Sequence, residues 1–140
     1  MANNLNIDLE SVQETNELEE LVMNLLQANL IVHIFHLRVV GTGSFAAHLA
    51  LGDLYVMFSD FADKICEQYQ GITSKLISFP STVTFDLPPI GTEIEYISEI
   101  LNMVDVFVEA YDDIDKTTSN ILQELSSNIR SSLYKLKFLK

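Results

Sequence analysis

The stretch HLRVVGTGSFAAHLALGDLYVMFSDFADKICE, residues 36–67, decides which fold we expect for this chain. From Leu18 to Val39, up to the Gly41-Thr42-Gly43-Ser44 break, apolar residues repeat at threes and fours on one stripe, as in an amphipathic helix. We predict one helix from a capping box at Ser11 and Glu14 to about Val40. A second helix should run from Ser44, as its capping residue, to Gln70, with Gly71 as its stop. The four-residue connection makes the two helices antiparallel neighbours.

Four side chains that could bind a metal lie along this stretch: His36, His48, Asp63 and Glu67. Asp63 and Glu67 are four residues apart, so a helix places them on one face. His48 and Asp63 would be about 22 Å apart on one helix, because each residue adds about 1.5 Å. Two such helices packed antiparallel across a two-fold axis would bring His48 of one chain near Asp63 of the other. Two imidazoles and two carboxylates would suit a first-row transition metal such as Fe(II).

This stretch resembles the Dps (DNA-binding protein from starved cells) miniferritins of the ferritin-like superfamily. The matching positions are His36, His48, Leu54, Tyr55, Asp63 and Glu67, and residues 115–122 are more weakly similar to the start of the final Dps helix. The resemblance implies an all-α, ferritin-like four-helix bundle that assembles from two-fold dimers into a hollow dodecamer. It also implies iron-oxidising sites at the two-fold interfaces, with histidines from one subunit and carboxylates from its mate.

Two positions depart from the Dps pattern. Gly52 stands where the family usually has an aspartate, and Leu37 stands where a tryptophan often follows the first histidine. Asp53 is a further candidate metal ligand, although it lies about 100° further round the helix than Gly52. Loss of one carboxylate would weaken a second iron position and spare the first. Tyr55 and Asp53 are candidates for orienting the histidines.

The remainder of the chain completes the predicted bundle as one domain, residues 1–140. Prolines between residues 71 and 91 exclude a long helix there, although STVTF has some strand character. By resemblance, this long crossover carries a short helix, for which Thr73–Ser78 is the candidate. A third helix is expected from Thr92 to Asp112 and a fourth from near Asp115.

The sequence leaves two interpretations open for several groups of polar residues. The acidic face of the third helix is either a solvated surface or a lining that attracts Fe(II). Asp112, Asp113 and Asp115 form either a capping cluster or the wall of an iron-entry pore. The basic residues near the C-terminus either favour the helix dipole or form a small anion-binding patch. His33 is interpreted as structural or interfacial, and Cys66 as a small buried hydrophobe.

Composition and net charge make several classes of function unfavourable for this chain. The chain has 140 residues, 48% of them hydrophobic, which favours burial of surplus apolar surface in a homo-oligomer. Its net charge of −12 repels nucleic acid and anionic membranes and attracts cations. The first ten residues contain no lysine or arginine, so DNA binding through this tail is not expected. The apolar run LIVHIFHLRVV is too short and too polar to span a bilayer, and the start lacks a signal peptide, so a cytoplasmic protein is expected.

Two functions follow as hypotheses. The favoured one is a ferroxidase that binds iron, oxidises Fe(II) with hydrogen peroxide and stores ferric iron. The alternative is a structural or interaction protein that keeps the Dps fold with a weakened or lost site, which Gly52 and Leu37 motivate. Compaction of DNA, as in some relatives, is disfavoured by the acidic charge.

Overall fold

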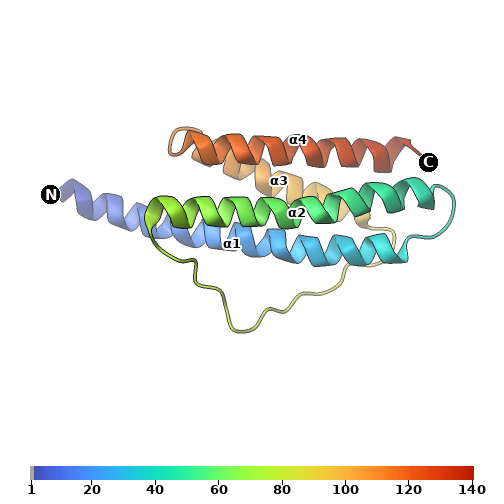
Figure 1. The fold of residues 1–140 in the computed structure, drawn as a ribbon, viewed down its shortest axis with the longest axis horizontal. Coiled ribbons are helices and arrows are strands. Elements are labelled where there is room, and N and C mark those ends of the chain that lie inside the picture. The colour runs from blue at the N-terminus through green and yellow to red at the C-terminus, as the bar shows by residue number, and fades with distance from the viewer. Residues whose placement is uncertain (1) are drawn as a thin grey trace.

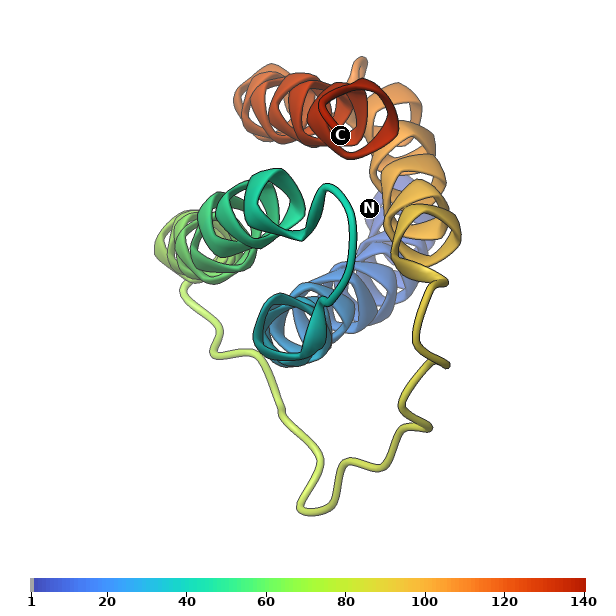
Figure 2. The same cartoon turned by 90° about the vertical axis from the view of Figure 1, so that its right-hand side faces the viewer.

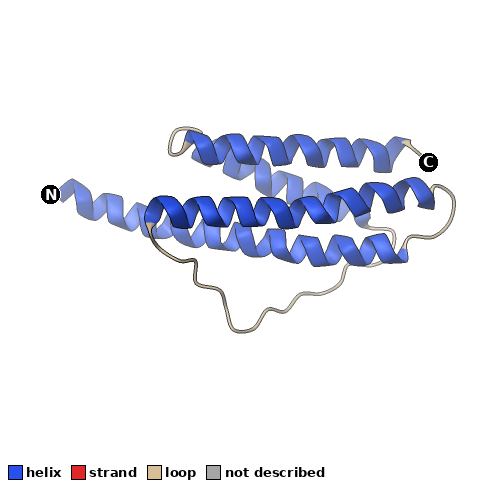
Figure 3. Ribbon diagram, viewed as in Figure 1, coloured by secondary structure: helices blue, strands red, loops and turns tan. Residues whose placement is uncertain are grey.

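The computed structural model describes the backbone of residues 2–140 and the side chains from Glu17 onward. It contains four helices: α1 (Ala2–Arg38), α2 (Ser44–Thr73), α3 (Glu93–Tyr111) and α4 (Lys116–Phe138) (Figure 1). No strand occurs between residues 2 and 140, and every connection is a loop or turn (Figure 3). The predicted all-α class with four helices is confirmed.

The helices form two hairpins packed on each other (Figures 1 and 2). The α1–α2 pair and the α3–α4 pair are each antiparallel and in close contact, and α2 packs on α4, whereas α1 and α3 touch less. A long loop leaves α2 at one end of the bundle and reaches α3 at the other, so α2 and α3 run in the same direction. The chain therefore has two short connections and one long crossover.

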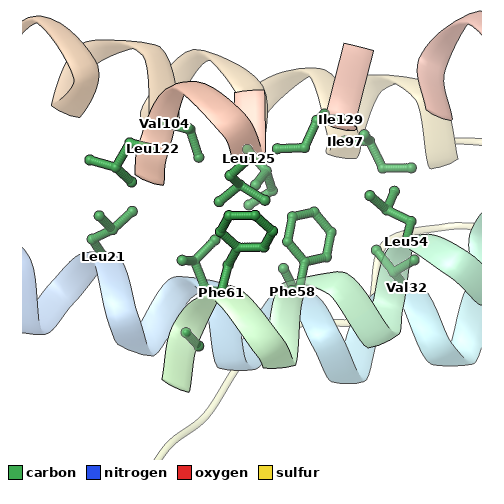
Figure 4. Packing of buried hydrophobic residues seen from close by; sticks show 14 of the residues in the cluster. Leu21, Val32, Leu54, Phe58, Phe61, Ile97, Val104, Leu122, Leu125 and Ile129 are labelled. Carbon is green, nitrogen blue, oxygen red and sulfur yellow. The ribbon is translucent and has the colours of Figure 1, made fainter. Parts of the chain in front are cut away.

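The core lies where the inner faces of the helices meet. Figure 4 shows Phe58 and Phe61 of α2 pointing toward Leu125 of α4. Six of the seven residues of the apolar stripe expected along the first helix are buried: Leu18, Leu21, Leu25, Ala28, Val32 and Phe35. The seventh, Val39, is half-buried and follows the end of α1. Burial of one such leucine or phenylalanine contributes about 1.5–3 kcal/mol, so this stripe holds α1 in the bundle.

The start of α1 differs from the prediction. The helix begins at Ala2 rather than near Ser11, and the side chains of the expected capping box lie outside the described residues. At its other end α1 stops at Arg38, two residues before the expected Val40.

The end of α2 also differs. The helix continues through Gly71 to Thr73, so Gly71 is not its stop. Ser74 takes that role with a left-handed backbone (φ 57°), and its N–H donates to the carbonyl of Gln70. The helix tolerates Gly71 because a glycine in a helix costs only about 1 kcal/mol relative to alanine.

The turn between α1 and α2 depends on two glycines. Gly41 and Gly43 have φ values of 97° and 79°, a region that side-chain-bearing residues avoid. A Cβ atom on Gly43 would also lie 3.1 Å from the Cα of Lys140. Gly43, not Ser44, is the residue that caps α2, and no side chain supplies a capping hydrogen bond.

The crossover, residues 74–92, contains no helix, so the predicted short helix at Thr73–Ser78 is wrong beyond Thr73. Two side chains explain the extended path, because they take the backbone N–H groups that a helix would use. The N–H of Ile77 donates to Oε1 of Gln70, and the N–H of Ser78 donates to Oε1 of Glu19. Ile77 is buried, and the chain beyond it bows away from the bundle (Figures 1 and 2).

The aspartates at the corner between α3 and α4 fit the first of their two interpretations, a capping cluster. Asp115 accepts hydrogen bonds from the N–H groups of Thr117 and Thr118. Asp112 pairs with Lys116 at 2.8 Å. Two of the three clustered aspartates therefore have ordinary structural roles.

The acidic face of α3 and the basic residues near the C-terminus, which had two interpretations each, are joined by one ion pair. Arg130 of α4 contacts Asp105 of α3 at 2.6 Å, and Asp105 also accepts from the hydroxyl of Ser126. This network ties α3 to α4, which gives Arg130 a structural role.

One segment of α1, Glu17–Arg38, is long and apolar enough to cross a membrane by length and composition. The prediction considered only a shorter run, residues 30–40, which overlaps the end of this segment. A core helix meets the same criterion, and the buried side chains of this segment form the α1 side of the core.

Candidate metal centre

The two histidines of the predicted site lie together in one chain. His36 is in the last turn of α1 and His48 is near the start of α2, so the tight turn between the helices brings them face to face. Their rings stack with centroids 3.7 Å apart and planes 20° apart. Both side chains are half-buried.

Each histidine is bonded to the backbone of the other. Nδ1 of His36 lies 2.7 Å from the carbonyl oxygen of His48, and Nδ1 of His48 lies 2.9 Å from the carbonyl oxygen of His36. A carbonyl oxygen only accepts, so both Nδ1 atoms carry the proton and donate it. In the neutral rings the lone pair is then on Nε2, the form in which histidine binds metal.

These bonds replace the orienting partners that we predicted. Tyr55 and Asp53 are not hydrogen-bonded to either imidazole among the interactions described for this chain. The carbonyl of His36 is one of the last four of α1, which have no partner within the helix, and this explains why His48 binds there.

The position of the His36 ring gives a steric reason for a glycine at position 52. A Cβ atom on Gly52 would lie 3.0 Å from Cε1 and 3.2 Å from Nδ1 of the His36 ring. Contacts this short force a neighbour to move, and here the neighbour is a ring fixed by a hydrogen bond and a stacking contact. The glycine at the position of the usual aspartate therefore makes room for the paired histidines.

His33 and Tyr55 extend the stack. Their rings are parallel within 9° with centroids 4.0 Å apart, and the Tyr55 ring lies 5.4 Å from that of His36. Asn29 of α1 donates to the carbonyl of Tyr55 at 2.7 Å. His33 thus has a structural contact within the chain, one of the two roles predicted for it.

The carboxylates of the predicted site lie elsewhere on α2. Asp63 and Glu67 are exposed, and Asp63 is fifteen residues beyond His48, a separation of about 22 Å along the helix. Asp53 is also exposed and joins neither group. Among the residues that the structure describes, no group of three or more His, Cys, Asp or Glu side chains could hold a metal ion within one chain.

Cys66 lies beside the carboxylates and is half-buried rather than fully buried as predicted. Burial raises the pKa of its thiol, and the negative charges of Glu67 and Asp63 raise it further. Cys66 is therefore a poor thiolate and an unfavourable metal ligand at neutral pH.

The exposed side of α2 carries a stripe, which we call the α2 stripe, with apolar residues in its first half and acidic residues in its second. Its members lie within about 40° of one another around the helix and are Phe45, Leu49, Val56, Asp63 and Glu67. Val56 is 48% exposed and lies midway between His48 and Asp63 in the sequence.

Comparison with known proteins gives one match. A family model described as "Family of unknown function (DUF5856)" matches residues 36–136. No curated protein and no solved structure matches the chain.

Proposed function

The chain belongs to the DUF5856 family, and we propose that it is a Dps-like, ferritin-like protein that binds and oxidises Fe(II) at sites shared between two subunits. Ferric iron would be stored in a hollow homo-oligomer, a dodecamer built from two-fold dimers. The observation that carries this proposal is the reciprocal bonding of His36 and His48, because it fixes both rings and directs both Nε2 atoms to a ligand role.

The topology supports the ferritin-like part of the proposal. Two antiparallel hairpins joined by one long crossover are the arrangement that ferritin-like bundles share. Bundles of this class build metal sites from histidine and carboxylate side chains on facing helices. The absence of a helix from the crossover changes an expected detail and leaves this topology intact.

The separation of histidines and carboxylates supports a site between subunits. One chain offers two imidazoles where α1 ends and α2 begins, and two exposed carboxylates on α2, of which Asp63 lies about 22 Å beyond His48. A two-fold axis near Val56 that packs two α2 helices antiparallel would place His48 of each chain opposite Asp63 of the other. Two sites would form per dimer, each lined by two neutral nitrogen and two charged oxygen donors, and the stacked imidazoles would turn apart for both Nε2 atoms to reach one ion.

The chemistry follows from the donor set. The imidazoles bind Fe(II), and the carboxylates add charge that favours the ferric product. Two Fe(II) ions each lose one electron, and hydrogen peroxide takes both electrons with two protons to give two water molecules. Molecular oxygen would serve as a slower oxidant. Iron is the substrate of this reaction, and Gly52 leaves each site with one carboxylate fewer than is usual in the Dps family, which favours one iron position over a second.

A second candidate function is a structural or interaction role for the same fold. Gly52 favours it, because the usual aspartate is absent and the space that its side chain would need is taken by the His36 ring. In that case the paired histidines would only stabilise the turn between α1 and α2.

The acidic charge of −12 and the absence of basic residues from the first ten make DNA an unfavourable partner in both cases. We also propose a cytoplasmic location without membrane association, since the most apolar helix segment contributes the α1 side of the core.

The experiment that tests the proposal compares Fe(II) oxidation by the native protein, His48→Ala and Asp63→Ala, with iron added anaerobically before peroxide. The native protein should oxidise iron faster than buffer, and both variants should lose that advantage. Glu124→Gln, a change of an exposed carboxylate on α4, is the control that should keep it. Rates equal to buffer for all four proteins would contradict the proposal and favour the structural role.

A further inference from the structure

The crossover contains an exposed extended segment between two prolines. Residues 81–87, SerThrValThrPheAspLeu, lie between Pro80 and Pro88, and all seven are exposed. In the described part of the chain, none of their backbone N–H groups donates a hydrogen bond to the protein. We call residues 81–87 the crossover segment.

The side chains of the crossover segment alternate with the period of a β-strand. Val83, Phe85 and Leu87 are 43%, 36% and 43% exposed, and Thr82, Thr84 and Asp86 alternate with them. Threonine, valine and phenylalanine favour strands, and an extended chain with unpaired N–H and C=O groups is a template for a further strand. Prolines donate no backbone hydrogen bond, so they set the limits of any pairing to residues 81–87.

We propose that the crossover segment pairs with the same segment of a second copy of this chain, as an antiparallel two-stranded ribbon with its two-fold axis at Thr84. This register is the one that uses all seven residues between the prolines, since the segment is symmetric about Thr84. Any shift shortens the ladder or brings a proline into it.

The segment is self-complementary in this register. Val83 faces Phe85 of the partner subunit, a β-branched and aromatic pair of the kind that stabilises sheets. Thr82 faces Asp86 of the partner subunit, which keeps the two aspartates of the ribbon apart. A segment with only one charged residue suits self-association of a chain with a net charge of −12.

The path of the crossover fits the same symmetry. It runs back along the bundle in the direction opposite to α2, passing outside α1 (Figures 1 and 2). One two-fold axis perpendicular to the helices would therefore make both α2 helices and both crossover segments antiparallel. Exposed leucines on α1, Leu26 and Leu30, offer apolar surface for one face of the ribbon. The inference goes beyond the proposed function, because it holds whether or not the chain binds iron.

Site-directed cross-linking of the full chain tests the register. In a Cys66→Ser background, Thr84→Cys places two thiols at the two-fold axis, where paired Cα atoms are about 4.5–5.5 Å apart, within disulfide range. Thr82→Cys is the matched control, because its two copies would be about 14 Å apart along the ribbon. Mild oxidation should convert most of the Thr84→Cys protein to a covalent dimer and leave Thr82→Cys monomeric on a non-reducing gel.

Two outcomes would overturn the inference: no dimer with Thr84→Cys, or equal cross-linking of both variants, which would indicate random collisions of the segment. Hydrogen exchange of the native protein supplies a measurement without substitutions. The amides of residues 81–87 that face the partner strand should exchange at least tenfold more slowly in the oligomer than in dilute monomer. Exchange at the same rate in both states would also overturn the inference.

Discussion

At the residue scale, the paired histidines and Gly52 form one steric unit. The sequence singled out His36 and His48 by their spacing and by the Dps resemblance, and the structure brings them together in one chain. The sequence could not predict that each imidazole binds the backbone of the other. Both acceptors are backbone carbonyl groups, which every residue has and which therefore carry no sequence signal. For the same reason Gly52 looked like a lost ligand rather than a space reserved for the His36 ring.

Substitution of Gly52 tests this unit. Gly52→Ala should destabilise the protein by about 1–3 kcal/mol, the usual cost of overpacking, because the new Cβ atom must displace the His36 ring. Gly71→Ala is the control, since it is also helical but open space surrounds it. It should be neutral or slightly stabilising, as alanine is the better helix former. Thermal unfolding measures both, and an unchanged midpoint for Gly52→Ala would contradict the steric account.

At the element scale, local signals located the helices and long-range contacts set their details. Apolar periodicity predicted four helices, and Asp115 marked the start of α4 correctly. The prediction for the crossover was wrong in one part. The extended path of the backbone at Ser78 depends on Glu19, which lies 59 positions earlier in the sequence. Interactions over such distances cannot be inferred from local composition.

A tyrosine in the weaker contact between α1 and α3 makes the stability of the fold depend on pH. Tyr96 of α3 packs edge-on against Phe35 of α1 with ring centroids 5.8 Å apart. Burial, followed by the charge of Glu99, raises the pKa of Tyr96 from 10.0 to about 12. The unfolded chain therefore ionises first, so this contribution to stability is complete below pH 10 and is lost as the pH rises toward 12.

Denaturant unfolding between pH 9 and pH 12 should show this loss in the native protein. Tyr96→Phe keeps the ring and removes the ionisable hydroxyl, so its free energy of unfolding should fall less over the same range. Tyr134→Phe, at a 54% exposed tyrosine, is the control and should behave as the native protein does. Identical slopes for the native protein and Tyr96→Phe would contradict the assignment.

At the scale of the whole molecule, a site shared between subunits requires a two-fold dimer through the α2 stripe. The sequence predicted the need for a second chain from the distance between His48 and Asp63, a quantity that helix geometry fixes. It could not show which residues surround the axis, because their exposure follows from the packing of the other three helices. The structure identifies Val56 as the exposed residue nearest the middle of that span.

A charge at that position should weaken the dimer. Val56→Glu would place two carboxylates near each other across the axis, and we expect at least a tenfold higher dissociation constant in sedimentation analysis. Val106→Glu is the matched control, because Val106 is 65% exposed on α3 and away from the α2 stripe. Equal weakening by both variants would point to net charge rather than to this interface.

The most direct test of the central claim mixes two inactive variants, His48→Ala and Asp63→Ala. If histidines and carboxylates come from different chains, each mixed dimer has one doubly damaged site and one intact site. Random co-assembly makes half of the dimers mixed, so Fe(II) oxidation should recover to about a quarter of the native rate. Mixing without recovery, in samples whose native mass spectra show mixed dimers, would contradict a site shared between subunits.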